Sequence, residues 1–492
     1  MKENKQTGNS IFAGIFWKLG ERTLAQLISF VVSIVLARIL MPEDYGTVAL
    51  VTIFITLADV CVTSGFGTSL IQKSDADELD YSTIFYCGLA VAVGMYCIIY
   101  FAAPLIAEFY DMPILVSILR VFGLRIPIGA YNSVQHAYVS RHMIFKKFFF
   151  STLIGTILSA FIGITMAIYG FGVWALVAQY MSNTIVDSIV LSFSVKWRPK
   201  LMFSRDRARA LMSYGWKVLA ADLIGTFFDQ LRSLIIGKKY VSADLAFYNK
   251  GQQIPNLVSS NLTNSVMTVL FPAMANCESN IANVKEMTRK AIKVLSYLVM
   301  PMMAFLGVIA EPLTIILLTE KWKASVPFMQ IICVGSAFGI IGGVSLQTMK
   351  AIGRSDKLLK LELYKKPVYL LLLVAGAMIN PIAIAVTLTL YNIYGTIVNY
   401  RAVGKLIGYS VKEQLDDMKA SCALAVVVIV VGSVVLGFRF SSYVTIFLQI
   451  VICGGIYIGL SKIFRVYGYT YIRDYILRQI RKHKNADNKS NS

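Results

Sequence analysis

Charged residues are scarce in this sequence: 15% of its 492 residues are Asp, Glu, Lys or Arg, whereas a soluble chain carries about 25%. Histidine is scarcer, and His136 and His142 stand without a Cys or carboxylate at metal-ligand spacing. The seven cysteines form no CxxC pair and fall mostly in apolar runs, which is typical of small core residues. Nothing resembles a nucleophile elbow, a Walker loop or a zinc motif. The sequence therefore predicts no catalytic residue, no metal and no cofactor.

Long apolar segments are what the sequence has instead. Hydrophobic residues make up 57% of the chain, and about fourteen segments of about 20 residues are each long enough to cross a bilayer core as a helix. We therefore predict an all-α polytopic membrane protein with about 14 transmembrane helices, interrupted at depth as at Pro127, Pro301 and Pro312. The predicted segments are Ile15–Leu40, Thr47–Ile71, Thr83–Ala103, Ile114–Ala137, Phe148–Tyr169, Val173–Val195, Ala210–Gly237, Ile254–Ala275, Val294–Leu318, Val326–Met349, Leu361–Met378, Ile382–Val403, Ala420–Gly437 and Tyr443–Ile463.

The connectors between these segments alternate in charge. With the N-terminus placed inside, the cytoplasmic connectors and tails hold roughly 32 Lys and Arg, and the opposite side holds about five. Those five are Lys238, Lys239, Lys321, Lys323 and Arg439. This bias predicts a multi-pass protein of the cytoplasmic membrane, with both termini cytoplasmic and no cleaved signal peptide. The net charge of +20 then indicates contact with anionic lipid headgroups and not with nucleic acid.

A faint internal repeat divides the helices into groups. The pattern Gly-x3-Leu-Ala begins at Gly20 in the first segment and again at Gly215 in the seventh. Six helices per half give both halves one orientation, so a pseudo-two-fold axis along the membrane normal would relate them. The predicted parts are an N-terminal lobe at 1–200, a C-terminal lobe at 201–410, a terminal helix pair at 411–465 and a basic cytoplasmic tail at 466–492.

Three stretches of this sequence are similar to a known family. They are LARILMPEDYG at 36–46, GFGTSLIQK at 65–73 and VLFPAM at 269–274. These stretches, with the Gly20 pattern, resemble bacterial polysaccharide exporters, the Wzx-type flippases of the MOP (MATE-related) superfamily, including WzxC-like and teichuronic-acid types. The resemblance is clearest over Ile11–Lys73 and Tyr214–Ala275, and the number of helices extends it over nearly the whole chain.

The resemblance implies a two-lobed bundle that rocks to move a lipid-linked oligosaccharide across the cytoplasmic membrane, for surface, capsular or exopolysaccharide synthesis. The carrier would be undecaprenyl pyrophosphate, and glycosyltransferases and a polysaccharide polymerase would be partners. A MATE-like exporter of cationic drugs is the alternative, but it favours a lumen dominated by carboxylates. A polysaccharide polymerase or ligase is a third hypothesis, which the short outer connectors argue against. A scaffold for a biosynthetic complex would leave the charges inside the membrane unexplained.

Cations inside the apolar segments are the candidates for substrate binding. A pyrophosphate that leaves water needs fixed cations, and each buried Arg or Lys costs about 2.5–3.5 kcal/mol on insertion scales. Arg120 and Arg125 come first, although about 140° separates them on an ideal helix. The alternative role of one or both is to join helices by pairing with Asp59 or Asp187. The other candidates are Lys217, Arg232, Lys365 and Lys366, of which the last two could instead anchor a helix in the headgroups.

Carboxylates inside the same segments are candidates for a coupling ion, either a proton or sodium. Asp222, Asp229 and Arg232 fall on one face of the seventh segment, where Asp229 and Arg232 can neutralise one another. That leaves Asp222 as a proton or cation site, and Asp59 is a further candidate. Structural pairing between helices is the alternative role for all three carboxylates.

One motif points to a different chemistry. Asp75-Ala76-Asp77 matches the DxD pattern with which glycosyltransferases hold a metal and a nucleotide-sugar. That use needs a soluble nucleotide-binding domain, and the sequence predicts none. The connector Lys73–Asp80 is also acidic although it falls on the cytoplasmic side, but acidic residues contribute little to orientation.

Overall fold

The computed structural model describes residues 20, 24–64, 70, 77–142, 144–195, 197–275, 280–438, 440–474 and 477–478. By its internal contacts the chain divides into two compact units, Met1–Ala246 (unit 1) and Phe247–Ser492 (unit 2). The regular secondary structure of the described residues is helical. Contacts within one structure do not test a repeat, so the lobes at 1–200 and 201–410 stay a prediction.

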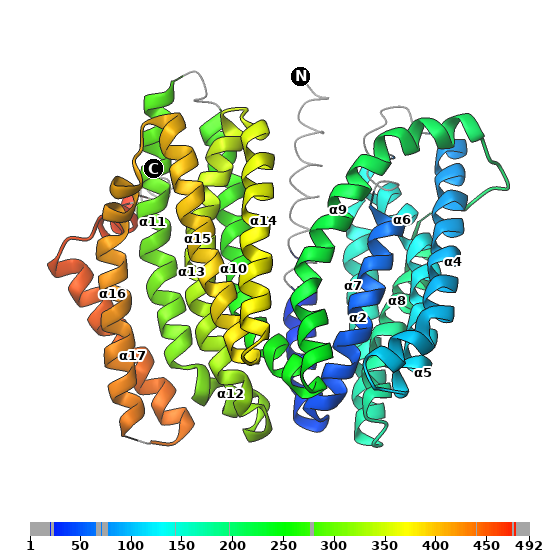
Figure 1. Cartoon of the computed structure of the whole chain (residues 1–492), viewed down its shortest axis with the longest axis horizontal. Coiled ribbons are helices and arrows are strands. Elements are labelled where there is room, and N and C mark those ends of the chain that lie inside the picture. Colours follow the sequence, from blue (N-terminus) through cyan, green and yellow to red (C-terminus); the bar gives the residue numbers. More distant parts are fainter. Residues whose placement is uncertain are drawn as a thin grey trace, which may run out of the picture. The chain divides into compact units, whose positions relative to one another are not determined.

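Unit 1 is a bundle in which each helix packs along its neighbours (Figure 1). Helix α7 lies along α8, α4 lies against α5 and α6, and α9 lies against α2. An apolar helix at Leu24–Ile39 precedes them. The helices are α2 (Pro42–Thr63), α4 (Glu78–Phe109), α5 (Ile114–Gly123), α6 (Arg125–Arg141), α7 (Phe145–Ile168), α8 (Val173–Ser194) and α9 (Arg205–Lys239); α10 (Ser242–Ala275) begins in unit 1 and continues into unit 2.

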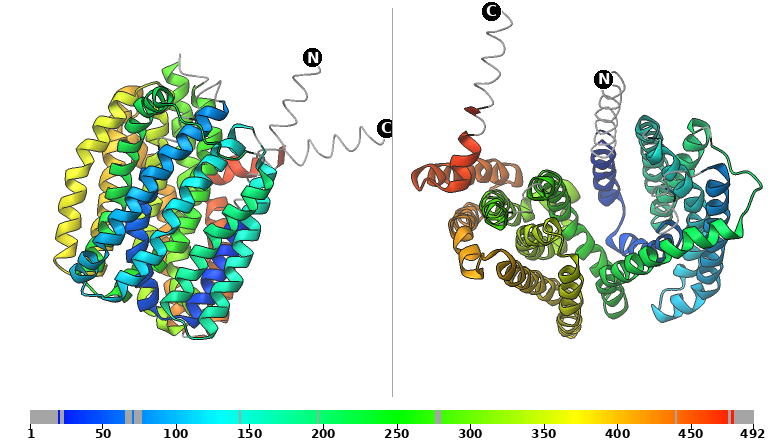
Figure 2. Two further views of the ribbon diagram at one scale, coloured as in Figure 1. Left: turned by 90° about the vertical axis from the view of Figure 1, so that its right-hand side faces the viewer. Right: turned by 90° about the horizontal axis from the view of Figure 1, so that it is seen from above.

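Unit 2 is a second bundle, whose helices are seen largely end-on from above (Figure 2). Helix α13 packs against both α15 and α11, α16 packs against α11, and a large apolar core fills the space between them. The further elements are α11 (Ile281–Val308), α12 (Ala310–Leu318), the 3-10 helix η1 (Glu320–Ser325), α13 (Val326–Ala351), α14 (Ser355–Ala377), α15 (Pro381–Ile407), α16 (Val411–Gly437) and α17 (Ser442–Ile463).

The all-α polytopic fold predicted from the sequence is confirmed. Every predicted segment overlaps described helix, and nine spans among the described residues are long and apolar enough to cross a membrane by length and composition. The predicted segments Ile114–Ala137 and Val294–Leu318 are each divided, into α5 and α6 and into α11 and α12. The N-terminal part of the predicted segment Ile15–Leu40 lies outside the described residues, as do residues 65–69 and 71 of the predicted segment Thr47–Ile71.

Proline explains where both divisions fall. A proline cannot donate to the carbonyl four residues before it, and its ring clashes with that carbonyl. Helix α5 ends at Gly123, four residues before Pro127, and α11 ends at Val308, four residues before Pro312. The predicted interruption at Pro301 is wrong, because α11 continues through this residue.

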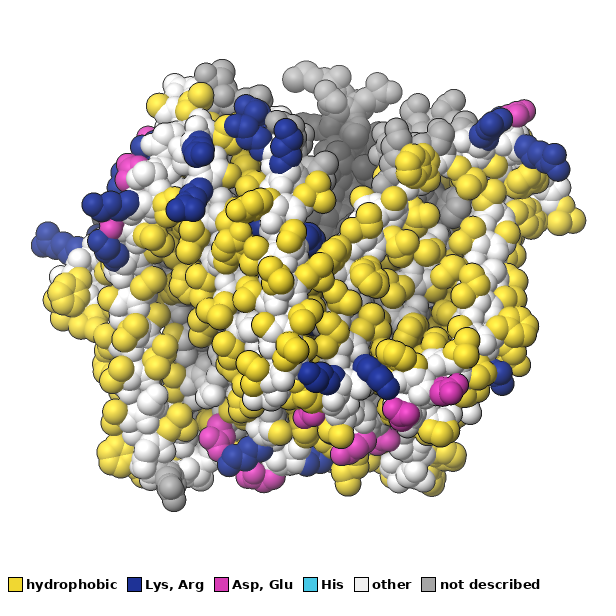
Figure 3. Space-filling model, viewed as in Figure 1, with side chains coloured by type: hydrophobic (Ala, Val, Ile, Leu, Met, Phe, Trp, Pro, Cys, Tyr) yellow, Lys and Arg dark blue, Asp and Glu magenta, His cyan; other side chains and the backbone are white. Residues whose placement is uncertain are grey.

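The basic connectors of unit 2 meet at one end of the bundle. Lys285 near the start of α11 donates to the Gly408 carbonyl after α15 and pairs with Glu413 of α16 at 3.4 Å. Thr288 of α11 bonds Thr348, near the end of α13, at 3.1 Å. On the face seen in Figure 3, Lys and Arg of this bundle gather at the same end, and apolar side chains cover the middle of α14, α15 and α16. Unit 2 therefore has one strongly basic end beside an apolar belt, as a membrane-spanning bundle requires.

A close approach of two backbones explains the glycine of the DYG sequence at 44–46. A Cβ built on Gly46 of α2 would lie 1.8 Å from the carbonyl oxygen of Ser242, which begins α10. A backbone atom cannot swing aside as a flexible side chain can. We expect Gly46→Ala to lower the free energy of unfolding by about 1–3 kcal/mol, the usual effect of overpacking.

Gly88→Ala is the matched control for this substitution. Gly88 lies in the interior of α4, and a Cβ there would meet nothing within 4 Å. Alanine should leave stability unchanged or raise it by about 0.5–1 kcal/mol through helix propensity. Unfolding of both purified variants in mixed detergent micelles tests the pair, and equal effects would contradict the role of the Ser242 contact.

Candidate functional site

Arg125 and Asp59 lie on two helices of unit 1 that pack against each other, α6 and α2. Arg125 is the first residue of α6, Asp59 lies in the last turns of α2, and both side chains are partly buried. The Asp59 carboxylate points at α6, because its Oδ1 lies 3.8 Å from the place that a Cβ on Gly129 would take. The charge of Arg125 acts on Asp59 and also on Tyr180 of α8. This group, called the Arg125 site below, combines a cation, a carboxylate and a phenol inside an apolar bundle.

Arg120 lies apart from this group. It belongs to α5, where its guanidinium sits 4.3 Å from the centre of the Tyr100 ring of α4 and its Nε lies 3.5 Å from the Tyr100 carbonyl oxygen. The two arginines have different neighbours although the helix breaks between them after Gly123. Arg120 contacts Tyr100 of α4, whereas the charge of Arg125 acts on residues of α2 and α8. The structure therefore does not bring the two leading candidates together.

Asp187 of α8 is held by polar groups from α6 and α7. Its carboxylate accepts from Ser151 and from Asn132 Nδ2 at 3.4 Å, and it lies 3.5 Å from His136 Nε2. The side chain of Asp187 is 17% exposed. Asp187 thus joins three helices through neutral donors and a histidine. Its place beside His136 was not foreseen, because the two are fifty-one positions apart in the sequence.

The candidates on α9 are spread along one long helix. Asp222 and Asp229 are exposed, and Arg232 is partly buried. The side chain of Lys217 lies outside the described residues. The assignment of Asp222, Asp229, Arg232 and Lys217 to substrate or ion binding stays a prediction.

Lys365 is a buried cation of unit 2. Its side chain is 7% exposed, donates to Glu362 Oε1 at 2.6 Å within α14, and donates to Asn399 Oδ1 of α15 at 3.3 Å. This geometry does not match an anchor in lipid headgroups, which would extend into water. Lys366, its neighbour, lies 5.9 Å from the centre of the Tyr369 ring.

Lys250 of α10 is a buried cation that sequence reasoning missed. The residue is 8% exposed, and its Nζ lies 5.6 Å from the centre of the Trp322 ring in η1. It directly follows the stretch Ala246–Asn249, which lies in a connector between two predicted helices, so Lys250 resembles a connector residue. The signal that could have found it is the start of α10 at Ser242, which places Lys250 two turns inside a helix.

The second aspartate of the DxD pattern has a structural position. Asp77 caps α4 by accepting from the Asp80 amide at 3.0 Å, and it pairs with Arg207 of α9. The hydrogen bond from Arg207 and that from the Asp80 amide lower the pKa of Asp77 to about 2. Lys200 pairs with Glu78 beside it. The described end of the acidic connector is therefore paired with two cations, Lys200 and Arg207. Asp75 lies outside the described residues.

A dense ionic cluster joins α11 to α16 at the basic end of unit 2. Asp417 is 6% exposed and accepts from Arg289 at 2.7 and 3.0 Å, from Lys293 at 3.1 Å and from the Tyr409 hydroxyl at 2.6 Å. Two cations and a hydroxyl on one carboxylate satisfy it fully. We interpret this cluster as a structural clamp and not as a ligand site.

Comparison with known proteins identifies relatives of the chain. Residues 35–327 match a family model described as polysaccharide biosynthesis protein. The succinoglycan biosynthesis transport protein ExoT of Rhizobium meliloti (strain 1021) is 23% identical over 345 residues, 70% of each chain. The lipopolysaccharide biosynthesis protein WzxC of Escherichia coli (strain K12) is 21% identical over 391 residues, which are 77% of this chain and 78% of WzxC.

Among solved structures, the fold is similar to that of the lipid II flippase MurJ in an inward closed conformation. The TM-score is 0.74 at 13% identity, and the match covers 94% of this chain and 100% of that one. At this identity the likeness shows the fold and nothing finer.

Proposed function

Because this chain belongs to the polysaccharide biosynthesis protein family, we propose that it is a flippase for a lipid-linked oligosaccharide. The cargo is a repeat unit on undecaprenyl pyrophosphate, carried across the cytoplasmic membrane by alternating access for surface polysaccharide synthesis. The family match over residues 35–327 carries the proposal. Full-length relatives named for succinoglycan transport and lipopolysaccharide biosynthesis support it. The basic connectors support an orientation with both termini in the cytoplasm.

The Arg125 site supplies a physical route for the charged part of the cargo. A pyrophosphate must leave water, and a planar guanidinium can hold two phosphate oxygens at once. With no cargo, we take Asp59 as the counter-charge of Arg125, whose charge acts on it. A bound pyrophosphate competes with Asp59 for the same cation, and the released carboxylate then binds a proton or sodium. Cargo binding and ion binding are thereby linked through one arginine.

The remaining candidates are separate hypotheses within each unit. Arg120 and Lys217 are further cations of unit 1, and Lys365 is a cation of unit 2, where Glu362 and Asn399 hold it in place. Asp222 and Asp229 are further ion sites on α9. Glycosyltransferases that build the repeat unit and a polymerase that consumes it are the partners that such cargo requires.

Reconstitution separates this proposal from drug export. Purified protein in liposomes should move a fluorescent undecaprenyl-pyrophosphate oligosaccharide between leaflets, as read by its protection from a membrane-impermeant oxidant. A proton or sodium gradient applied across the same liposomes should change that rate. Transport of a cationic dye without any movement of the lipid-linked sugar would contradict the proposal and favour the MATE-like alternative.

A further inference from the structure

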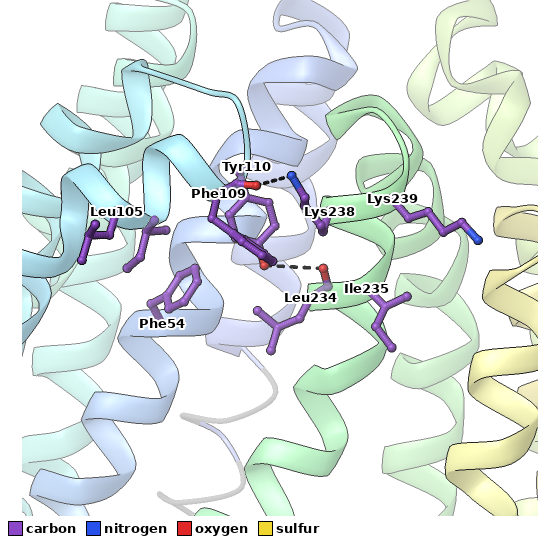
Figure 4. Close-up of a pocket in the computed structure, with 9 residues that line it drawn as sticks. Phe54, Leu105, Phe109, Tyr110, Leu234, Ile235, Lys238 and Lys239 are labelled. Carbon is purple, nitrogen blue, oxygen red and sulfur yellow. Dashed lines mark hydrogen bonds between the residues drawn. The ribbon is translucent and has the colours of Figure 1, made fainter.

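A wide apolar groove lies on unit 1 between α2, α4 and α9 (Figure 4). It encloses about 600 Å³, which is within the usual size of a small-molecule site. Phe54 and Tyr110 meet edge to face at 6.2 Å on one wall, and Leu234 and Ile235 form the other. The full lining is Phe54, Leu105, Ile106, Phe109, Tyr110, Leu234, Ile235, Lys238 and Lys239.

Two cations stand where the groove meets the end of α9. Lys238 donates to the Phe109 carbonyl and pairs with Asp111 at 3.2 Å, so its position is fixed and its charge is balanced. Lys239 also lines the groove and is exposed; its side chain extends away from that of Lys238 (Figure 4) and adds a second positive charge at this end. The Tyr110 hydroxyl donates to the Leu234 carbonyl at 3.5 Å and so joins the α4 side of the groove to α9. A tyrosine and lysines at the end of an apolar surface are typical of the headgroup level of a bilayer.

From this arrangement we propose that the groove is a binding site for one anionic phospholipid of the bilayer. One acyl chain lies against the apolar walls, and the phosphodiester sits at Lys238 and Lys239. With Asp111 balancing Lys238, these three side chains carry one net positive charge, which matches one phosphodiester. The site does not depend on what the protein transports.

The length of the groove favours a phospholipid over the prenyl chain of the cargo. Its wall on α9 runs from Leu234 to Lys239, about 8 Å along the helix. That is about half of one leaflet of a 30 Å hydrocarbon core, so the groove covers the upper part of an acyl chain with its phosphate at the mouth. A long prenyl chain would leave most of its surface outside and gain little there.

Native mass spectrometry of the full-length protein in detergent tests the site, with dioleoylphosphatidylglycerol and dioleoylphosphatidylcholine as probes. We expect the wild type to bind one phosphatidylglycerol in preference to phosphatidylcholine. Ile106→Trp fills the groove from α4 and should reduce binding of both lipids, and Ile235→Trp fills it from α9 in case the first variant fails to fold. Ile98→Trp is the matched control, because Ile98 is an exposed isoleucine of α4 outside the groove.

The charge pair is tested separately. Lys238→Gln with Lys239→Gln changes the net charge of this group from +1 to −1, because Asp111 remains. It should lower the preference for phosphatidylglycerol by about thirtyfold, the effect of about two lysines at a membrane surface, and leave phosphatidylcholine binding as it was. Lys323→Gln is the control, since Lys323 also pairs with an acidic residue, Glu311, at 2.7 Å.

Unchanged binding in both groove-filling variants would overturn the proposal, and so would an unchanged lipid preference in the double lysine variant. Displacement of phosphatidylglycerol from the wild type by an equal concentration of undecaprenyl phosphate would also overturn it, because the carrier would then be the occupant. Transport of lipid-linked sugar is read in a different assay, so failure of this site and failure of the flippase proposal are distinguishable.

Discussion

An Arg125→Gln variant is expected to lose lipid-linked oligosaccharide transport by about tenfold or more, because a charge-assisted hydrogen bond to phosphate is worth about 1.5–3 kcal/mol. The substitution removes the guanidinium whose charge acts on Asp59 of α2 and Tyr180 of α8. Arg125→Lys keeps the charge but loses the planar guanidinium, so its transport rate should lie between those of the wild type and Arg125→Gln. Proteoliposome transport and complementation of surface polysaccharide in a deletion strain measure the effect.

A loss of transport alone does not separate binding from structure, because Arg125→Gln also leaves Asp59 without its facing cation. The double variant Arg125→Gln with Asp59→Asn restores the charge balance. If Arg125 binds cargo, the double variant should regain thermal stability but not transport. If the pair only joins helices, stability and transport should return together, and the assignment of Arg125 to the cargo is wrong.

Arg401→Gln is the control for the loss of an arginine. Arg401 is an exposed residue of α15 in the basic end of unit 2. Its loss should leave transport within about twofold of the wild type, since an exposed charge contributes little. Unchanged surface polysaccharide in the Arg125→Gln strain would contradict the proposed site directly.

The fold follows from the sequence because membrane insertion leaves few alternatives. A helix satisfies its own backbone in lipid, so an apolar segment of about 20 residues dictates both element and length. The breaks were harder to place. Pro127 and Pro312 end the preceding helix four residues earlier, whereas α11 tolerates Pro301. Which proline divides a helix depends on packing around it, and a single sequence does not contain that information.

The site is less predictable because charge pairing is a tertiary property. Helical geometry correctly separates Arg120 from Arg125, and Asp59 was one of two partners considered for them. The other, Asp187, is instead occupied by Ser151, Asn132 and His136, from helices that periodicity cannot place side by side.

The sequence also does not show which lysines are buried or what they pair with. Lys365 resembles a headgroup anchor by its place in the sequence, yet Glu362 and Asn399 hold it inside unit 2. Lys250 attracts no attention in the sequence and is buried against Trp322. Insertion cost identifies which charges need a partner, but only the packed structure shows the partner.

Substitution of Asp417, in the clamp between α11 and α16, should lower stability and leave transport unchanged, the opposite of what we expect for Arg125. Asp417→Asn removes the anion that Arg289 and Lys293 share, and these two cations then repel each other beside the Tyr409 hydroxyl. Breaking a buried pair costs about 3–5 kcal/mol; Arg289 is 44% exposed, so we expect about 2–3 kcal/mol. For a bundle of this size that lowers the melting temperature by about 5–10 °C, measured by tryptophan fluorescence of purified protein.

Asp416→Asn is a close control, because this adjacent carboxylate pairs, among the described residues, with Lys419, and that lysine is 73% exposed. It should change stability by less than about 0.5 kcal/mol. If the clamp serves only to hold α11 to α16, transport per folded molecule should stay near the wild-type value in both variants. A transport defect in Asp417→Asn protein at full stability would contradict the structural role and would make the basic end of unit 2 part of the cargo path.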